Sequence, residues 1–418
     1  MDARVTTDPP APTPPTPHRR WLRRLALGTA VLLLAGVGIC WWLYDRLDDN
    51  ITTDPDTANE LELYEAERPV SVVRGAQNVL LIGSDTRTGK GNAQYGRNFG
   101  TQRSDTTILL HLAADRESAT AVSVPRDLMV DIPRCALAKK KRSKPQFAQF
   151  NWAFERGGAA CTIRTVEKLT GIRVDHHVIV DFRGFKKMVN AVGGVEVCLK
   201  EPIDDDEAKL ELPAGRQVLR GEEALGFVRA RYSIGNGSDT GRIARQQQFL
   251  AALVKKVHSN GVLFNPRRLY PVLDAATKSL TTDPGLGSLR RLYDLIRAMR
   301  DIPDERVRFL TVPRQPYTYN PNRDELVQPD ADQLFRQVRL DQPVTVARAE
   351  TIRDDGNAAA PAGDDRKTVE KEVEERGERK VAGKVGEKVG EKVAEKKGAP
   401  AAKPSAYAGA MAAQGMCK

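Results

Sequence analysis

One uncharged run near the N-terminus constrains this 418-residue chain more than any other feature. The run from Leu25 to Leu43 reads LALGTAVLLLAGVGICWWL and holds 19 residues without a charged side chain. At about 1.5 Å per residue, a helix of that length just crosses a hydrocarbon core of about 30 Å. We therefore predict one transmembrane helix over residues 25–43.

The charges on either side of this run predict its orientation. Four arginines precede it and three aspartates follow it, namely Arg19, Arg20, Arg23, Arg24, Asp45, Asp48 and Asp49. The positive-inside rule places the Pro-rich tail, residues 1–24, in the cytoplasm and the rest outside. A cleaved signal peptide is the alternative, but its apolar region would span only about 7–15 residues before small side chains. We expect a single-pass type II membrane protein, which excludes cytosolic nicotinamide and ATP chemistry.

Composition divides the remaining chain into three parts. Residues 44–76 are a polar connector with a short helix expected near Glu60–Glu67, and residues 77–342 carry a periodic apolar pattern that predicts one domain. Residues 343–418 form a low-complexity Lys/Glu-rich tail with a four-residue repeat over 381–396. A valine at every fourth position gives a helix only a thin apolar stripe, and glycines interrupt it. We interpret the tail as a solvated spacer, with binding to an anionic wall polymer as the alternative.

Strand and helix patterns interleave within the domain. Apolar or alternating runs predict strands at Asn78–Gly83, Thr106–Leu112, Thr120–Val124, Val174–Phe182, Val195–Leu199 and Val307–Val312. Amphipathic runs predict helices at Thr162–Leu169, Phe182–Val192, Glu222–Val228, Ile243–Ser259 and Leu289–Met299. The expected fold is therefore α/β, a single extracytoplasmic domain with a central mixed sheet flanked by helices.

The sequence contains no complete version of several common catalytic motifs. Residues 83–91 resemble a Walker A loop, but the spacing has one residue too many and Gly91 replaces the hydroxyl residue that binds magnesium. The sequence contains neither HExxH nor GxSxG. Zincin protease and α/β-hydrolase interpretations therefore have no support.

Charged residues stand instead at the ends of three predicted strands. Asp85 follows the first strand, Arg103 and Asp105 open the second, and Arg126 with Asp127 closes the third. Ligands bind at strand ends in α/β sheets. Paired carboxylates suit a hard divalent cation such as Mg²⁺ or Mn²⁺, which also takes substrate phosphate oxygens. Salt bridges at the sheet edge are the alternative interpretation.

A second charged set follows further along the chain. Arg229 and Arg231 are two residues apart, so on a strand or extended turn they project to one side. Asp239 is a suitable N-cap for the next helix, and Arg242 and Gln246 share one face of it. A helix start with arginines around it binds anions, and arginine forks match phosphate oxygens. A solvated helix face is the alternative.

Seven co-linear segments carry a family resemblance. They are NVLLIGSDTR, RSDTTILL, VSVPRDLMVDIP, NWAFERGG, HHVIVDFRGFKKMVNAVGGVEV, LPAGRQVLRGEEALGFVRAR and SDTGRIARQQQFL, and they span roughly residues 77–312. Together they resemble the LytR–CpsA–Psr family of cell-wall glycopolymer phosphotransferases. The resemblance implies transfer of a glycopolymer from a polyprenyl-pyrophosphate carrier to peptidoglycan, with formation of a phosphodiester. It also implies an apolar tunnel for the lipid, for which residues 182–192 and 249–257 are candidates.

The resemblance also implies roles for the residues singled out above. Asp85 and Asp105 would bind the metal, and Asp239 would orient the arginines or act as a base. The pyrophosphate would be held by Arg103, Arg126, Arg229, Arg231, Arg242 and Gln246, among which Arg126, Arg229 and Arg231 would also act in catalysis. Some relatives carry a second small domain at the C-terminus, where this chain offers only the repeat tail.

Two other function classes stay open at this point. A polyprenyl-pyrophosphate pyrophosphatase would use the same residues with water in place of the sugar acceptor. A non-enzymatic wall-binding or regulatory membrane protein is the other class. The formal net charge of +10 and the pI near 9.3 would also suit nucleic acid. We expect no nucleic-acid partner, because only the short N-terminal tail would be cytoplasmic.

The cysteines predict one disulfide. Cys40 lies in the apolar run and Cys417 in the tail, which leaves Cys135, Cys161 and Cys198 in an extracytoplasmic domain where oxidation is allowed. These three permit three single pairings. Cys198 lies within an apolar strand, where a free thiol packs as a small hydrophobe. We favour Cys135–Cys161, which would hold the basic loop KKKRSKPQ near the entrance for the acceptor.

Overall fold

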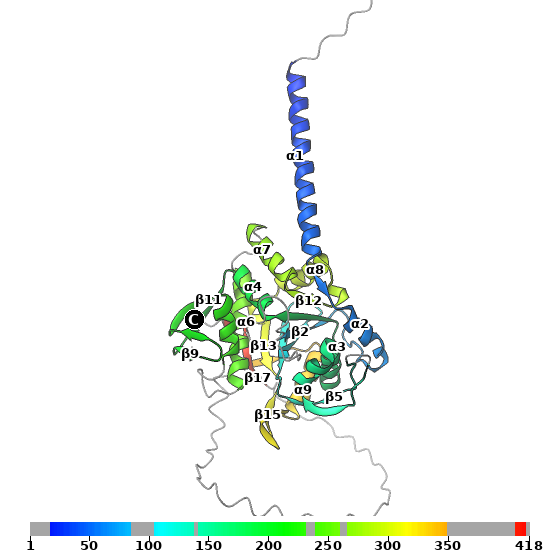
Figure 1. Cartoon of the computed structure of the whole chain (residues 1–418), viewed down its shortest axis with the longest axis vertical. Helices are drawn as coiled ribbons and strands as arrows, with labels where there is room; N and C mark the ends of the chain where they lie inside the picture. Colours follow the sequence, from blue (N-terminus) through cyan, green and yellow to red (C-terminus); the bar gives the residue numbers. More distant parts are fainter. Residues whose placement is uncertain are drawn as a thin grey trace, which may run out of the picture.

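The computed structural model describes residues 17–84, 104–137, 141–230, 239–259, 266–348 and 406–414. Within these residues a nine-stranded sheet forms the centre of the domain (Figure 1). Its strands are, in spatial order, β1 (Thr52–Thr53), β12 (Leu280–Thr282), β7 (His176–Asp181), β2 (Gln77–Ser84), β3 (Ser104–Leu112), β4 (Ala119–Val124), β13 (Val307–Thr311), β17 (Ala406–Met411) and β16 (Thr345–Arg348). Parallel and antiparallel pairs both occur, so the predicted mixed α/β fold is confirmed.

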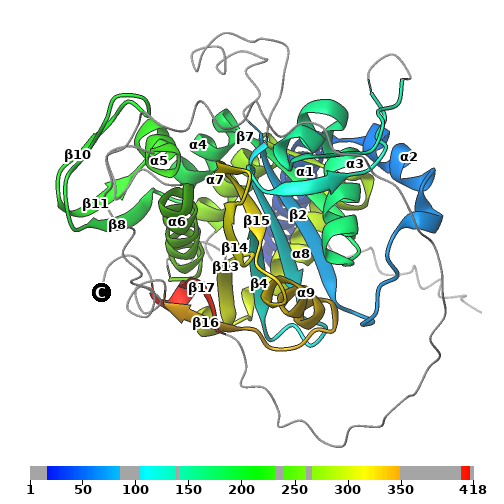
Figure 2. The ribbon, with the colours of Figure 1, turned by 90° about the horizontal axis from the view of Figure 1, so that it is seen from below.

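Helices cover both faces of the sheet (Figure 2). The helices are α1 (Pro17–Asp48), α2 (Pro55–Glu62), α3 (Asn151–Thr170), α4 (Phe182–Ala191), α5 (Gly221–Arg229), α6 (Asp239–Ser259), α7 (Pro266–Thr277), α8 (Leu289–Arg300) and α9 (Asp330–Arg339). Leu80 and Ile82 of β2 join a core cluster with residues of α3 and α9, whereas Val79 joins a cluster with residues of α6 and α8. Adjacent residues of one strand thus enter different cores, as the period of two requires.

Smaller strands and 3-10 turns complete the described structure. Two-stranded pairs are formed by β5 (Met129–Ile132) with β6 (Gln146–Gln149), β8 (Val195–Leu199) with β11 (Gly215–Leu219), β9 (Ile203–Asp205) with β10 (Leu210–Leu212), and β14 (Arg314–Tyr317) with β15 (Asn320–Leu326). The 3-10 turns are η1 (Glu65–Glu67), η5 (Pro284–Leu286), η6 (Asp304–Arg306) and η7 (Ala412–Gln414). Strands β8–β11 and helices α4 and α5 pack around Phe227 and Phe249, which makes a third core beside α6.

Helix α1 projects away from the domain (Figure 1) and is longer than the predicted 25–43. Its segment Arg24–Asp48 is long and apolar enough to cross a membrane, and the domain buries none of its most apolar window. The apolar run marks only the part that suits hydrocarbon, while the helical backbone continues through the charged residues at both ends. The helix begins at Pro17, inside the predicted tail, while its candidate membrane span begins at Arg24, next to the predicted boundary.

The predicted connector, residues 44–76, is part of the folded domain. Strand β1 pairs in parallel with β12, and α2 contacts α3. The side chain of Asp54 caps α2 by accepting a hydrogen bond of 3.1 Å from Thr57 N, and Leu61 is buried. The sequence did not predict these contacts, because a single buried leucine and a capping aspartate in a polar segment give little periodic signal.

The domain extends past the predicted C-terminal boundary at residue 342. Strand β16 lies beyond residue 342, and β17 inserts between β16 and β13, parallel to the first and antiparallel to the second. Glycine is required at position 409, where a Cβ would lie 2.1 Å from the carbonyl oxygen of Phe309. The last described residues of the predicted tail therefore belong to the central sheet.

Helix α3 begins at Asn151, well before the predicted Thr162, and bends at two glycines. Gly158 has a φ of 61° and a ψ of −151°, a conformation that side chains rarely adopt. The bend interrupts the 3.6-residue pattern, so periodicity revealed only the second half of the helix.

Candidate functional site

A cavity of about 180 Å³ opens where β3 and β4 meet α5 and α6. Its lining is mostly charged or polar, and comprises Asp105, Arg126, Asp205, Glu207, Ala208, Val228, Arg229, Arg242 and Gln246. Five of these residues were predicted from the sequence, so the structure brings together the described members of both charged sets. We take this cavity as the candidate active site.

The sheet register places Asp105 against Arg126. Strands β3 and β4 are antiparallel with Thr107 opposite Val124, so the start of β3 meets the residues that follow β4. Arg126 Nη1 donates to Asp105 Oδ1 at 2.7 Å, and its Nε donates to Asp127 Oδ2 at 3.2 Å. Asp127 also accepts a hydrogen bond of 2.7 Å from Gln149 Nε2. Two carboxylates on different segments thus fix the orientation of the guanidinium.

Arg229 reaches the cavity from a helix rather than from the predicted strand or extended turn. It is the last residue of α5, and Ala230 leaves the helix with a ψ of 138°. The guanidinium carbon lies 4.9 Å from the centroid of the Phe182 ring. This cation–π contact restricts the side chain while the cavity remains open beside it.

Helix α6 supplies Arg242 and Gln246, which lie one turn apart and both line the cavity, as predicted. Arg242 is only 5% exposed. Gln246 Nε2 donates to the carbonyl oxygen of Val228 at 3.0 Å, and its Oε1 accepts a longer contact of 3.5 Å from Thr106. The amide therefore connects α6 to both the end of α5 and the start of β3.

Two neighbours on α6 hold the helix in place. Arg245 is buried and donates to the carbonyl oxygen of Ala230. Burial lowers the pKa of Arg245, and the negative charge of Asp205 opposes that shift. Gln247 Nε2 donates to Thr311 Oγ1 at 2.8 Å and to Ser123 Oγ at 3.3 Å. These bonds fix α6 against β4 and β13.

Sequence reasoning missed Asp205 and Glu207. They lie at the end of β9 and in the turn after it, within the acidic run Asp204–Glu207. Asp205 is buried and accepts a hydrogen bond of 2.9 Å from Ala208 N. An acidic run between two predicted elements was the available signal, but such runs are more often solvated turns.

The other predicted residues cannot be placed in the cavity. Asp85, Arg103 and Arg231 lie outside the described residues, and Asp239 is the first residue of α6 with its side chain outside them. Strand β2 ends at Ser84, which pairs with Ser104 at the start of β3. The described part of β2 therefore ends at the same edge of the sheet as the start of β3, which carries Asp105.

Of the two predicted metal ligands, Asp105 lies within the described residues. Within the described residues no group of three or more His, Cys, Asp or Glu side chains is arranged to hold a metal ion. Asp105 is 32% exposed beside the cavity and offers hard oxygen ligands, with the carboxylates of Asp205 and Glu207 along the same lining. That donor set fits Mg²⁺ or Mn²⁺ rather than a softer metal.

The segments proposed for a lipid tunnel meet in a packed cluster where they are described. Phe249 is fully buried, and its ring lies 5.7 Å from that of Phe185 and 6.1 Å from that of Phe227. Phe249 therefore does not line an open tunnel in this conformation. Phe185 and Phe249, one from each segment, instead contribute to the third core.

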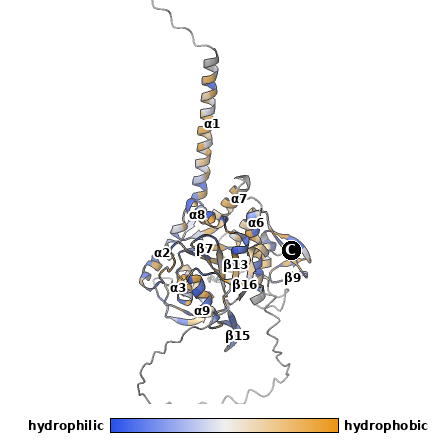
Figure 3. Cartoon of the chain, turned by 180° about the vertical axis from the view of Figure 1, so that it is seen from behind, coloured by the Kyte–Doolittle hydropathy of each residue, from blue (hydrophilic) through white to orange (hydrophobic). Residues whose placement is uncertain are grey.

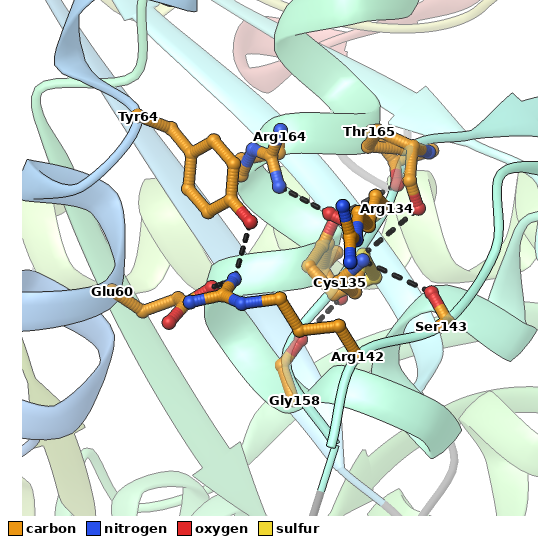
Figure 4. Close-up of a disulfide and its surroundings, with 12 residues drawn as sticks. Glu60, Tyr64, Arg134, Cys135, Arg142, Ser143, Gly158, Arg164 and Thr165 are labelled. Carbon is orange, nitrogen blue, oxygen red and sulfur yellow. Dashed lines mark hydrogen bonds and ion pairs between the residues drawn. A yellow bond between two sulfur atoms is a disulfide. The ribbon is translucent and has the colours of Figure 1, made fainter. Parts of the chain in front are cut away.

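The predicted disulfide is present between Cys135 and Cys161, with a Cα–Cα distance of 5.4 Å. Cys135 N donates to Ser143 Oγ at 3.0 Å, and Ser143 N donates to the carbonyl oxygen of Cys135. Figure 4 shows Arg142 of this loop between Glu60 and Tyr64. A second cavity, of about 730 Å³, is lined in part by this loop and by the bend of α3.

The prediction for Cys198 was wrong. Cys198 is disulfide-bonded, and its partner lies outside the described residues. Cys40 is free. Cys198 does lie in a strand, β8, as predicted, but a place in an apolar strand does not determine whether a cysteine forms a disulfide.

Residues 47–339 match the LytR_cpsA_psr family profile, so the chain belongs to that family. It is 33% identical over 266 residues to the cell wall biosynthesis protein LcpA of Corynebacterium glutamicum, covering 57% of this chain and 50% of LcpA. It is 34% identical over 267 residues to the polyisoprenyl-teichoic acid–peptidoglycan teichoic acid transferase TagU of Enterococcus faecalis, covering 63% of this chain and 78% of TagU. The chain spans about half the length of the Corynebacterium relatives that it matches.

Solved structures support the fold. The crystal structure of Bacillus subtilis TagV superposes with a TM-score of 0.50 at 24% identity, covering 65% of this chain and all of TagV (100%). A Streptococcus agalactiae protein gives a TM-score of 0.52 at 22% identity, covering 64% of this chain and 89% of that one. The central sheet and its helical layers are therefore a shared architecture.

Proposed function

We propose that this protein is a membrane-anchored phosphotransferase that moves a glycopolymer from a polyprenyl-pyrophosphate carrier to peptidoglycan. The observation that carries the proposal is the convergence of Arg126, Arg229 and Arg242 on one cavity, next to the carboxylate of Asp105. Arginines at a shared cavity match the dense negative charge of a pyrophosphate. The names of the relatives supply the carrier and the wall acceptor.

The residues of the chain suggest how the reaction would run. A sugar hydroxyl of peptidoglycan attacks the phosphorus that bears the glycan, and the bond from that phosphorus to the bridging oxygen breaks. The acceptor proton is lost, and polyprenyl phosphate leaves. Arg126 is held by Asp105 and Asp127, so its charge is in position before the substrate arrives. Such preorganised charge stabilises the non-bridging and leaving oxygens.

Asp85 and Asp105 would hold a divalent cation, which when bound neutralises charge on the phosphates. Asp239, at the start of α6, would orient the arginines or accept the proton of the acceptor. General-base help of that kind contributes about 10²–10⁴-fold. The Cys135–Cys161 bridge would keep the basic loop beside the second cavity, where we place the approach of the acceptor.

The topology is part of the proposal. Helix α1 has the length and apolarity of a membrane span, with arginines before it and aspartates after it. We propose a single-pass type II orientation with the domain outside the membrane. A carrier lipid in the same membrane would then present its pyrophosphate to a domain tethered above the outer surface.

A transfer assay with the full chain in detergent micelles tests this function. A polyprenyl-pyrophosphate glycan is incubated with and without peptidoglycan oligomers, and the phosphodiester product is measured by mass spectrometry. We expect product only with the acceptor and with magnesium, and loss of both activity and magnesium stimulation in Asp105→Asn. Asp131→Asn, an exposed carboxylate on β5, is the matched control and should retain transfer.

The same assay decides against the alternatives. Glycan phosphate released at equal rates with and without acceptor would identify a pyrophosphatase and contradict transfer. Absence of both products with natural donors would contradict the enzyme assignment and favour a wall-binding or regulatory protein.

A further inference from the structure

Helix α8 lies where the membrane-spanning helix meets the domain. The backbone N–H of Leu289, the first residue of α8, donates to Asp48 Oδ1 at 2.7 Å, and Asp48 is the last residue of α1. Both α7 and α8 contact α1, and Leu47 of α1 is buried. Figure 3 shows the apolar α1 entering the domain beside α8. The start of α8 is thus fixed directly to the end of the span.

The position of the membrane surface follows from the aromatic residues of α1. Trp41, Trp42 and Tyr44 are exposed near its end, and such residues lie at the headgroup level of a bilayer. Asp48 comes four residues after Tyr44, which is about 6 Å along a helix. Headgroups add about 5–8 Å on each side of the hydrocarbon core. The start of α8 therefore lies at the depth of the lipid headgroups.

The side chains of α8 suit that depth. Leu289 and Leu292 are buried against the domain. The solvent side exposes Arg290, Arg291 and Arg297 in the described structure, against the single carboxylate of Asp294. Arg300 is a different case, because it pairs with Asp301.

Two exposed apolar side chains accompany these arginines. Tyr293 is 48% exposed and Ile296 is 38% exposed, and they lie three residues apart on one side of α8. Arg297 follows Tyr293 by four residues, so its charge lies next to this apolar pair. A helix that combines a basic face with exposed aromatic and aliphatic side chains is typical of segments that lie in a membrane interface.

We propose that α8 is an interfacial helix that binds anionic phospholipid headgroups, with Tyr293 and Ile296 entering the lipid boundary and Arg290 and Arg297 contacting phosphates. The inference rests on the membrane anchoring proposed above. A second contact beside α1 restricts rotation of the domain about the span. It thereby holds the domain in one orientation relative to the membrane surface.

Lipid photo-crosslinking of the full chain tests this contact. The protein is placed in nanodiscs of phosphatidylcholine that contain about 30% phosphatidylglycerol, which gives the bilayer a negative surface charge. A trace of either lipid carries a photoreactive headgroup, and crosslinked peptides are mapped by mass spectrometry. We expect the α8 peptide to prefer phosphatidylglycerol over phosphatidylcholine by about 5-fold or more. Arg290→Gln with Arg297→Gln should bring that preference close to one.

The matched control removes two arginines from α9, Arg336→Gln with Arg339→Gln, which are exposed on a helix at the other end of the domain (Figure 1). This control should crosslink like the unmodified chain. Equal labelling of α8 by both lipids would overturn the proposal. Binding of soluble polyglycerol phosphate through Arg290 and Arg297, without lipid crosslinks, would also overturn it and assign the face to a wall polymer.

These outcomes separate the inference from the proposed function. Transfer in detergent micelles should be unchanged in the Arg290/Arg297 variant, because neither residue lines the candidate active site. Asp105→Asn should lose transfer while α8 keeps its lipid preference. The lipid contact of α8 and the transfer activity can therefore be contradicted independently of each other.

Discussion

Two arginine–carboxylate pairs in this domain differ in how far their side chains are exposed. Arg68 and Glu167 join the segment before β2 to α3, and their side chains are only 10% and 3% exposed. Arg126 and Asp105 join the ends of two strands, and their side chains are 21% and 32% exposed. Both pairs have an N–O distance of 2.7 Å, so the bond itself does not distinguish them.

The difference lies in what surrounds each pair. Glu167 accepts from two nitrogens of Arg68 and from Val174 N, and Arg68 Nη2 also donates to the carbonyl oxygen of Val174. Arg68 Nη1 also donates to Glu65 Oε2 at 3.4 Å, so the guanidinium is bonded to groups of the domain itself, and we call this cluster closed. The Arg126 pair borders a cavity that Arg229 and Arg242 share. We conclude that the closed cluster serves folding, whereas the open one is arranged for an anionic ligand.

The largest effect should come from breaking the closed cluster. Glu167→Ala leaves the buried guanidinium of Arg68 with the exposed Glu65, at the longer distance of 3.4 Å, as its only carboxylate partner, and it removes the acceptor of Val174 N. Loss of one partner of a buried pair costs about 3–5 kcal/mol. We expect that loss in the free energy of unfolding, measured by urea denaturation of the full chain in micelles. A change below about 1 kcal/mol would contradict the structural role of the cluster.

The open cluster should show the opposite behaviour. Arg126→Lys keeps the charge but cannot reach Asp105 and Asp127 with two nitrogens at once. We expect the transfer rate to fall about 10²–10³-fold, as when one preorganised donor is removed. The unfolding midpoint should remain close to that of the unmodified chain, because the pair is partly exposed.

Arg314→Lys is a useful comparison for this variant. Arg314 pairs with Asp324 on the neighbouring strand and does not line the candidate active site. Its substitution should leave the transfer rate within about 3-fold, as expected away from the reacting groups. Equal losses in both variants would show that Arg126 acts only through the fold.

The sequence predicted the described part of the open cluster well, and for a physical reason. Asp105 and Arg126 stand next to strands whose apolar runs mark their ends clearly, and antiparallel pairing then brings those ends together. The closed cluster had no such marker. Glu167 lies inside a helix and Arg68 in an irregular segment, and their contact spans 99 residues. Long-range pairing of isolated charges leaves no periodic signal.

The lack of a periodic signal also explains why the sequence did not predict Asp205, Glu207 and β17. Asp205 and Glu207 enter the cavity from short strands that pair only locally. The strand β17 follows a long polar segment and is rich in alanine and glycine, so its composition indicated a tail. Its position is decided by the sheet edge of β13 and by the space beside α6.

The C-terminal residues pack against a helix of the open cluster, so their removal should affect the two clusters differently. Helix α6 carries Arg242 and Gln246, and the C-terminal residues pack against it: Ala412 is fully buried, and Lys255 Nζ donates to Ala413 O at 3.4 Å. Truncation after Arg348 should lower stability by only about 2 kcal/mol, since the lost burial is offset by the backbone entropy regained. We also expect weaker transfer, because α6 loses its support, whereas Arg68 and Glu167 keep theirs.

A matched deletion separates the strand from the segment before it. Replacement of residues 351–403 by a Gly/Ser linker of about ten residues can bridge the paired strands, because a flexible chain of that length spans roughly 15–20 Å. This variant should keep both stability and transfer. Loss of transfer in the linker variant, with stability unchanged, would contradict the supporting role of β17.

The smallest effect concerns Asp54, a carboxylate that is hydrogen-bonded within the domain and also borders a cavity. Asp54 lines the second cavity, but it accepts hydrogen bonds from Thr57 N and, at 2.7 Å, from Thr57 Oγ1. His177, whose Nε2 lies 3.6 Å from Oδ2, contributes most to lowering the pKa of Asp54 from 3.8 to about 2. A carboxyl with a depressed folded pKa stabilises the protein above its unfolded value and loses that contribution as pH falls through the folded one.

Stability should therefore decline as pH falls from about 4 to about 2, and Asp54→Asn should flatten that decline while still capping α2. Urea unfolding midpoints between pH 4.5 and pH 2 measure it, about the range that brackets both pKa values. Asp56→Asn, an exposed residue in the first turn of the same helix, is the control and should keep the slope. Because its hydrogen bonds are already satisfied, Asp54 should not matter for transfer at neutral pH. A large loss of transfer in Asp54→Asn would show that bordering a cavity, and not an open hydrogen-bonding environment, is what marks a functional carboxylate here.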